Sequence, residues 1–514
     1  MNLFPRPILY CVIAFFFIIV LLPLLVMYYE AFASLPSVSV LLPDKRQMIL
    51  LANSLIIGIG TTLGSFAAGF PLAFLISRAA LPFKRLFFGF SFIPLFIPPY
   101  LNTIGWVKLI GPSGLNLSFN LYGHAGVILI MSLAYFPFIT LLALAGLNSV
   151  DPRYEEAASL VSSPRKIFRS VTLPLIYPYL ISGMIFVFVF SISNYSVPDL
   201  LRVNTYPVEI FTQFSAFYDS RQAALLSLPL MVVTLILILF QRHYMGRKAY
   251  CALNTQRRAN SGSNFGAAKI PALCYCAGIV LFSSVIPVSI LIINAGPWST
   301  YLTAWKTAHS QILNTVFLAA ASATIMVGIG FPLGYIIQRA GKTASLTVDI
   351  LSLLPFAVPG AVLGIGLIKL WNRPATNFIY ATLLVVFFAH TARFIAFAVR
   401  VAAAGIGRVP KNIEEAAALV PKNFLSLLGR IIFPLNKKTI LYAWIVCFAF
   451  SAGELEATLL VTPAGEATLP IRIYTLLHYG AYKLVFSLCV ILIAVIFLPF
   501  LAALVIKTKR SPAV

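Results

Sequence analysis

The sequence predicts an all-α integral membrane protein with about twelve transmembrane helices, arranged as two parallel repeats of six. Its 514 residues are 60% hydrophobic and only 10% charged, with a mean hydropathy of +0.95, a composition that excludes an ordinary soluble globular protein. Apolar segments recur along the chain, and one polar, alanine-rich segment occurs twice between them. Because a helix satisfies its backbone hydrogen bonds internally, we expect a helical bundle in the bilayer rather than a sheet.

The expected spans follow from length. About 20 apolar residues are needed to cross a hydrocarbon layer of roughly 30 Å. Segments of this kind lie at 8–29, 49–77, 85–110, 124–148, 174–198, 222–241, 270–294, 312–337, 346–370, 378–404, 437–461 and 484–506.

The net charge of +23 is distributed in a way that indicates membrane topology. Lysine and arginine outside the spans gather in alternate loops, so the positive-inside rule makes those loops cytoplasmic. Both termini and the linker at 242–269 fall on that side. Nucleic-acid binding is not expected, because no basic stripe is interleaved with aromatic residues on a polar surface.

An internal repeat runs through most of the chain at a spacing of 261 residues. Six spans in each half bring both copies into the membrane with the same orientation, which predicts a parallel repeat. The first half covers 1–241, a cytoplasmic linker covers 242–269, and the second half covers 270–514. The matching segments are Asn53-Ser54 with Asn314-Thr315, Phe70-Pro71-Leu72 with Phe331-Pro332-Leu333, Arg78 with Arg339, and Lys108-Leu109 with Lys369-Leu370.

A charged, alanine-rich motif lies in one cytoplasmic loop of each half, at about 151–174 and 410–434. Its carboxylates are near a helix N-terminus, where the helix dipole favours them, and its alanines would let another backbone approach closely. The motif consists of Glu155, Glu156, Ala157 and Ala158 in the first copy, and of Glu414, Glu415, Ala416 and Ala417 in the second. A partner protein on the cytoplasmic side is therefore expected.

This motif resembles the EAA loop in the membrane subunits of binding-protein-dependent ABC importers. The two-half organisation resembles the fused permeases of the iron(III) and thiamine branch. The resemblance implies that these eight residues form coupling helices on two copies of a separate ATPase, and that a periplasmic binding protein delivers the substrate. It implies a bacterial inner membrane location and, first among substrates, iron(III). Thiamine, polyamine and phosphonate import are alternatives, and an ion-coupled secondary transporter is the competing class.

Both motif copies depart from the family pattern, which has a glycine after the alanines. Val161 or Ser162 occupies that region in the first copy and Pro421 in the second. Proline can still end a helix because it fixes φ, but the turn must differ from a glycine turn.

The chain itself is not expected to be an enzyme. Gly341-Lys342-Thr343 imitates the end of a phosphate-binding loop, but Ile336 stands where such a loop requires glycine, and no strand is expected before it. We therefore expect ATP hydrolysis on another subunit, and neither a cofactor nor a resident metal site in this chain.

Polar residues at membrane depth are costly and are therefore candidates for the substrate pathway. The segment after the fifth span of each half aligns so that Asn194 matches Glu454. Interhelical hydrogen bonding is the alternative role. The pathway candidates are Asn194, Tyr195, Asp199, His390, Arg393, Glu454 and Glu456.

Two further features are expected from the pattern. Prolines 94, 98 and 99, and their counterparts 355 and 359, should break the third and ninth spans. The segments 206–211 and 469–474 also correspond, and we interpret them as short outer elements that could contact a binding protein.

Overall fold

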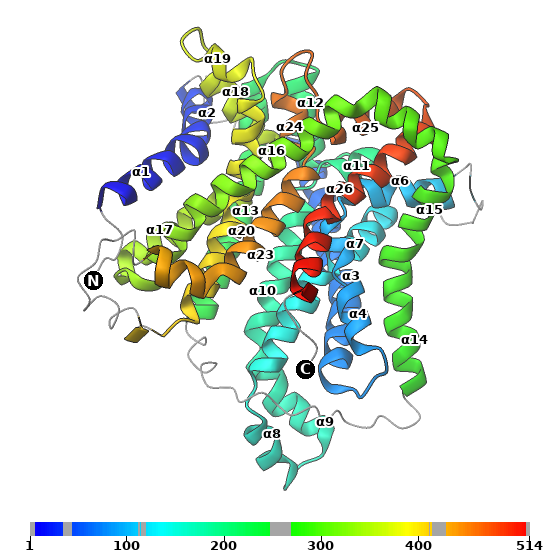
Figure 1. Cartoon of the computed structure of the whole chain (residues 1–514), viewed down its shortest axis with the longest axis vertical. Helices are drawn as coiled ribbons and strands as arrows, with labels where there is room; N and C mark the ends of the chain where they lie inside the picture. The colour runs from blue at the N-terminus through cyan, green and yellow to red at the C-terminus, as the bar shows by residue number, and fades with distance from the viewer. Residues whose placement is uncertain are drawn as a thin grey trace. The chain divides into compact units, whose positions relative to one another are not determined.

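The computed structural model describes residues 6–33, 44–111, 114, 120–246, 269–410, 412–413 and 428–509, and the regular elements in these ranges are helices (Figure 1). Nine of these helices are long and apolar enough to cross a membrane, and two bent pairs raise that number to eleven. The remaining expected span, 437–461, corresponds to α23 (Phe433–Ala452), which is not among the eleven and carries Lys437 and Lys438. The helical membrane fold is confirmed, whereas the count of twelve is not.

The chain divides into two compact units that do not coincide with the halves of the sequence repeat. One unit comprises residues 43–209 and 229–293, and the other comprises 1–42, 210–228 and 294–514. The first span of each repeat therefore belongs to the unit that is built mainly from the other repeat.

The first unit is formed mostly by the first repeat, together with the span that begins the second. Three of the described helices cross its boundary with the other unit: α12 (Tyr206–Ser215), α13 (Ser220–Gly246) and, by its last two residues, α15 (Ile286–Ala295). Its other elements are α3 (Lys45–Arg78), α4 (Lys84–Phe90), α5 (Ile93–Phe96), α6 (Pro99–Ile110), α7 (His124–Ser149), α8 (Pro152–Ser159), α9 (Pro164–Ile167), the π-helical turn η3 (Phe168–Thr172), α10 (Leu173–Ile192), α11 (Ser196–Leu200), α14 (Lys269–Val280) and η6 (Leu281–Val285).

Small residues let the helices of this unit approach closely, as is usual between helices in membranes. A Cβ atom on Gly69 of α3 would lie 2.6 Å from the carbonyl oxygen of Phe136 in α7. The Thr140 hydroxyl donates a 3.2 Å hydrogen bond to the Gly69 carbonyl. On another side of α3, the Tyr275 hydroxyl of α14 donates to the Ala67 carbonyl over 2.7 Å. Helices α3, α7 and α10 run alongside one another, and α8 and α9 project beyond the end of α10 (Figure 1).

The second unit is formed by the second repeat and the N-terminal span. Its elements are α1 (Arg6–Phe16), η1 (Phe17–Leu21), α2 (Leu22–Ala33), α16 (Trp298–Arg339), α17 (Lys342–Ala357), α18 (Gly360–Trp371), α19 (Asn377–Tyr380), α20 (Leu384–Gly407), η7 (Leu428–Ile432), α23, α24 (Thr458–Val461), α25 (Leu469–His478) and α26 (Tyr482–Lys509). Gly330 of α16 repeats the close approach of Gly69, since its Cβ would lie 2.7 Å from the Cβ of Ala398 in α20.

The first span of each repeat packs against a glycine of the other repeat, and these two glycines occupy equivalent positions. In one unit a Cβ on Gly105 of α6 would lie 3.1 Å from the carbonyl oxygen of Pro287 in α15. In the other unit a Cβ on Gly366 of α18 would lie 2.8 Å from the carbonyl oxygen of Pro23 in α2. Gly105 and Gly366 are 261 residues apart, which is the repeat spacing. The exchange of first spans is therefore reciprocal.

The prolines break the third and ninth spans as expected. The segment Lys84–Phe96 meets Pro99–Ile110 at 98°, and Lys342–Phe356 meets Gly360–Trp371 at 100°. In α6 the residues from Tyr100 to Trp106 are all buried, and in α18 those from Gly360 to Ile368 are all buried. The broken spans thus turn into the interior of their units, where backbone groups freed at a break can be satisfied by protein.

Candidate functional site

The first copy of the motif forms the short helix α8, followed by the single turn α9. Asp151 caps α8, because its Oδ1 atom accepts a 3.0 Å hydrogen bond from the backbone N–H of Arg153. None of the residues in α8 is buried. Tyr154 is 62% exposed, and Leu160 and Val161 just beyond the helix are each 85% exposed. Apolar side chains grouped outside the spans in this way are typical of a surface that another protein covers.

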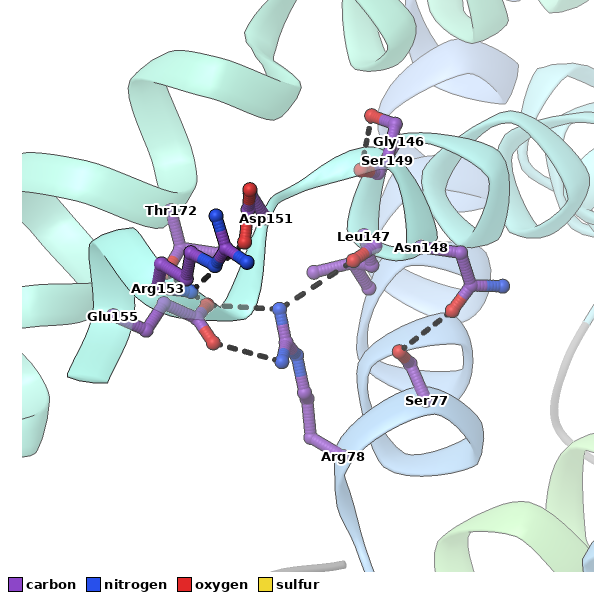
Figure 2. Close-up of polar contacts among 10 residues, drawn as sticks. All are labelled: Ser77, Arg78, Gly146, Leu147, Asn148, Ser149, Asp151, Arg153, Glu155 and Thr172. Atoms are coloured by element: carbon purple, nitrogen blue, oxygen red, sulfur yellow. Dashed lines mark hydrogen bonds and ion pairs between the residues drawn. The ribbon is translucent and has the colours of Figure 1, made fainter. Parts of the chain in front are cut away.

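Glu155 is the residue that fastens α8 to the membrane helices (Figure 2). Both terminal nitrogens of Arg78, at the end of α3, donate 2.8 Å hydrogen bonds to its two carboxylate oxygens. The Thr172 hydroxyl, just before α10, donates a third bond of 2.8 Å. Arg78 also reaches the Leu147 carbonyl near the end of α7, at 3.4 Å. One carboxylate therefore joins α8 to the ends of three long helices.

The ionisation of the Glu155 carboxyl depends on the guanidinium of Arg78. Burial raises the pKa of the Glu155 carboxyl, and the hydrogen bond from Thr172 acts in the opposite direction. The two-pronged contact with Arg78 also favours the ionised carboxylate, because charge-assisted bonds of this geometry are among the strongest in proteins. The two side chains are only 13% and 14% exposed, so water screens the pair weakly.

The two adjacent carboxylates of the motif consequently face different surroundings. Successive residues on a helix point about 100° apart, so Glu155 and Glu156 cannot share one face. Glu155 turns toward Arg78, whereas Glu156 and Ala157 are exposed and Ala158 is partly buried. Glu156 and Ala157 thus lie on the surface of α8, while Glu155 is engaged within the chain.

The second copy of the motif, including Glu414, Glu415, Ala416 and Ala417, lies outside the described residues. The arginine that corresponds to Arg78 is described: Arg339 donates to the carbonyls of Ile406, at 3.1 Å, and Val409, at 2.7 Å. Ile406 follows Leu147 by 259 residues, the spacing that separates Glu155 from Glu414. Arg339 therefore contacts the end of α20 as Arg78 contacts the end of α7.

Four of the expected pathway residues come together in the second unit. Arg393 of α20 lies 2.5 Å from a carboxylate oxygen of Glu456 and 3.6 Å from one of Glu454. Glu454 also accepts a 2.9 Å bond from the backbone N–H of Thr458 and a bond from its hydroxyl. His390 contacts the same hydroxyl at 3.0 Å. These four expected residues and Thr458 form one network, in which Arg393 is partly buried and the other four residues are buried; we name it the Arg393 cluster.

Gly360 makes room for this cluster at the break between α17 and α18. A Cβ atom at this position would collide with Nη1 of Arg393 and would lie 3.0 Å from the Cβ of Glu456. The sequence indicated a break at Pro359 but not the steric role of the next residue, Gly360. Thr458 was also missed, because a threonine in an apolar segment carries little signal by itself.

The two repeats contain a similar pair of stacked rings at this depth. Phe138 stacks on Phe190 with centroids 4.9 Å apart and an interplanar angle of 24°. Phe397 stacks on Phe450 with 4.7 Å and the same angle. In this register Ala134 occupies the position of Arg393, and the first repeat therefore has no guanidinium there.

Asn194 and Glu454 perform the same local task in their repeats. Asn194 accepts a 3.0 Å bond from the N–H of Val197, before α11, as Glu454 accepts a 2.9 Å bond from the N–H of Ala457, before α24. Asn194 also donates to the Tyr135 hydroxyl at 3.4 Å. Of the other candidates in the first repeat, Tyr195 is buried next to Asn194 and Asp199 is half-buried in α11. The first repeat thus retains the cap without the ion pairs.

Comparison with known proteins gives a consistent result. Residues 4–250 match the family described as binding-protein-dependent transport system inner membrane component. The ferric transport system permease protein FbpB of Actinobacillus pleuropneumoniae is 23% identical over 87% of this chain and 69% of its own length. An Fe(3+)-transport system permease protein, FbpB 2, of Haemophilus influenzae is 24% identical over 84% of this chain and 85% of its own length.

A third relative, a putative 2-aminoethylphosphonate transport system permease protein of Salmonella typhimurium, is 24% identical over 37% of this chain and 71% of its own length. The membrane helices, the exposed motif helix and these likenesses agree with one another. They agree in indicating a membrane permease of binding-protein-dependent ABC transport: residues 4–250 match the model of that family, and the ferric permeases extend the likeness over most of the chain.

Proposed function

We propose that this permease imports iron(III), driven by ATP hydrolysis on a separate subunit. The observation that carries the proposal is the extent of the likeness to the ferric permeases, which align with 84–88% of this chain. The aminoethylphosphonate permease aligns with only 37% of it. A phosphonate importer is accordingly the second candidate.

The exposed surface of α8 docks on the ATPase, and the second motif docks on another copy. The apolar residues Tyr154, Leu160 and Val161 supply the contact area, while Glu156 meets a basic group of the partner. A docking site needs apolar area that becomes covered and a charge at its rim, and α8 offers both.

Glu155 transmits movement of the docked helix α8 to the membrane helices. When the ATPase subunits close or separate, α8 is displaced, and the Arg78 contact transmits this displacement to α3, α7 and α10 together. A helix that rested on the membrane domain through apolar contacts alone could slide, whereas a two-pronged ion pair fixes both distance and orientation.

The proposed membrane topology follows from docking of the motif loops on a cytoplasmic ATPase. Both termini, the linker at 242–269 and both motif loops lie in the cytoplasm, and α12 and α25 lie on the periplasmic side, where a binding protein delivers the substrate. The distribution of lysine and arginine along the sequence supports this orientation.

The Arg393 cluster acts as a gate on the substrate pathway. It joins α18, α20 and the segment before α24 at a point where α18 turns into the unit. Separating these elements requires the ion pairs of Arg393 to break, so the cluster favours the closed arrangement until the ATPase supplies the free energy. The other pathway candidate in this cluster, His390, helps to orient Thr458.

The assignment can be tested with the complex of permease, ATPase and binding protein in lipid nanodiscs. Binding protein loaded with iron(III) should stimulate ATP hydrolysis, whereas the same protein offered thiamine or 2-aminoethylphosphonate should not. Stimulation by 2-aminoethylphosphonate and not by iron(III) would replace the first candidate with the second. Failure of the permease to copurify with any ATPase would contradict both.

A further inference from the structure

A pocket of about 550 Å³ lies between α12 and the segment formed by α24 and α25. All of its lining residues belong to one compact unit. Four of them carry groups that can bind a metal ion: the phenols of Tyr218, Tyr474 and Tyr479 and the imidazole of His478. We name this the tyrosine pocket. The rest of its lining is mainly phenylalanine and leucine.

His478 is held in one tautomer. Its Nδ1 atom lies 2.9 Å from the backbone carbonyl oxygen of Tyr474, one helical turn earlier. A carbonyl can only accept, so Nδ1 carries the proton and Nε2 presents its lone pair. Histidines that bind metal ions usually donate their other nitrogen to a carbonyl or carboxylate in this way.

Tyr218 occupies its position at a conformational cost. Its φ angle is 57°, in the left-handed region that favours glycine. The equivalent turn of the second repeat, after α25, uses Gly480 with φ 76°. Since glycine makes this turn without strain, the tyrosine at 218 is not explained by the turn. A strained side chain at the mouth of a pocket is a reason to look for a ligand.

The donors in the pocket suit a hard, highly charged cation. Phenolate oxygen is a hard ligand, and imidazole is a common iron ligand. The part of the chain that the structure describes contains no group of three His, Cys, Asp or Glu side chains placed to hold a metal ion, so a site in this pocket depends on its phenols. Three phenolates would balance the charge of one iron(III) ion.

We propose that the tyrosine pocket binds iron(III) transiently as the ion leaves the binding protein. This inference rests on the proposed function, since it requires iron(III) to be the substrate. Each phenol that binds the ion releases its proton, and no oxidation or reduction is involved. Tyr218 and Tyr479 are 87% and 79% exposed, so they can take the ion from a carrier and release it by exchange of ligands.

The test uses the full-length permease in nanodiscs, titrated with iron(III) supplied as its citrate complex. Phenolate coordination gives iron(III) a visible charge-transfer band, which gallium(III) does not give. We expect this band in the wild type, its loss when Tyr218, Tyr474 and Tyr479 are all changed to phenylalanine, and weakening by about tenfold or more in His478→Gln. Tyr442→Phe, at an exposed tyrosine of α23, is the matched control and should retain the band.

Tyr218→Gly separates binding from folding. This variant relieves the strained φ angle, so its melting temperature should equal or exceed that of the wild type, while its charge-transfer band weakens. A band of full strength in the triple phenylalanine variant, or the absence of a band in the wild type, would overturn the inference.

Uptake assays distinguish failure of this inference from failure of the proposed function. If the complete wild-type complex takes up iron(III) and the triple variant does so at the same rate, the pocket is not a substrate site, although the permease is still an iron importer. If the wild-type complex takes up no iron(III), the proposed function is wrong and the inference fails with it.

Discussion

The contact between Glu155 and Arg78 allows a quantitative prediction for Glu155→Gln. The substitution keeps the shape of the side chain but removes its charge and one acceptor oxygen. The native carboxylate accepts three bonds of 2.8 Å, two from Arg78 and one from Thr172. Glutamine has one acceptor oxygen, so it cannot accept hydrogen bonds from both terminal nitrogens of Arg78. Its amide nitrogen would face one of these N–H donors.

The magnitude follows from the number and surroundings of these bonds. A hydrogen bond to a charged group contributes ~1.5–3 kcal/mol. The two side chains retain 13% and 14% exposure, so solvent screening reduces the sum. A net loss of about 2 kcal/mol for the attachment of α8 is a reasonable estimate, which lowers the ratio of attached to detached helix by about 30-fold.

The assay is the coupling between ATP hydrolysis and transport in the reconstituted complex, together with limited trypsin cleavage at Arg153. Glu155→Gln should expose α8 to cleavage and lower the amount of substrate transported per ATP hydrolysed. Glu156→Gln is the matched control. It should weaken association with the ATPase, because Glu156 faces outward, without increasing cleavage of the isolated permease.

Exchange of the two charges gives the sharpest check. Arg78→Glu combined with Glu155→Arg restores an ion pair in reverse orientation, and it should recover part of the coupling that each single change removes. Unchanged cleavage and coupling in Glu155→Gln, or no recovery in the exchanged pair combined with normal folding, would refute the role assigned to this contact.

Three further outcomes are expected. Gly360→Ala should abolish uptake without preventing assembly, since its Cβ collides with Arg393. Gly328→Ala is the control and should be neutral, because a Cβ there meets no atom within 4 Å. Equal effects of the two substitutions would contradict the packing around Gly360. Glu456→Gln breaks the shorter ion pair of the Arg393 cluster. It should raise the rate of ATP hydrolysis in the absence of binding protein by about fivefold or more, a ~1 kcal/mol effect. An unchanged rate would show that this ion pair is purely structural. Lys342→Ala should leave hydrolysis by the complex intact, and its loss would place the nucleotide site on this chain.

Most of the membrane architecture could be predicted from the sequence, because hydrocarbon imposes a strong requirement on each span. The two breaks were predicted from the prolines, although their angles of 98° and 100° were not. The helical segment before the expected span at 312 was not predicted: α16 begins at Trp298 and is kinked at Ala308, and the part before the kink mixes polar and apolar residues, so it carries little hydropathy signal.

The exchange of first spans could not be predicted either. A repeat in the sequence shows that two segments are equivalent, but not which neighbour each one packs against. The close contacts at Gly105 and Gly366 decide this, and they depend on residues 182 and 343 positions away in the chain.

The sequence singled out the residues of the candidate site, whereas only part of the geometry that joins them could be predicted. The repeat drew attention to Arg78 and Arg339, yet nothing in the sequence indicated that Arg78 would bind Glu155, 77 residues later. Consequently both carboxylates of the motif were expected to face a partner. Helical geometry already excludes this, because adjacent residues cannot lie on one face.

The assignment as a whole depends most directly on ATP-driven uptake of iron(III). Proteoliposomes that contain the permease and its ATPase, with iron-loaded binding protein outside and ATP inside, should accumulate radiolabelled iron(III). Accumulation should stop when ATP is replaced by a non-hydrolysable analogue, and it should persist when ion gradients are collapsed. Uptake that continues without ATP hydrolysis but disappears with the ion gradient would show a secondary transporter and contradict the central claim.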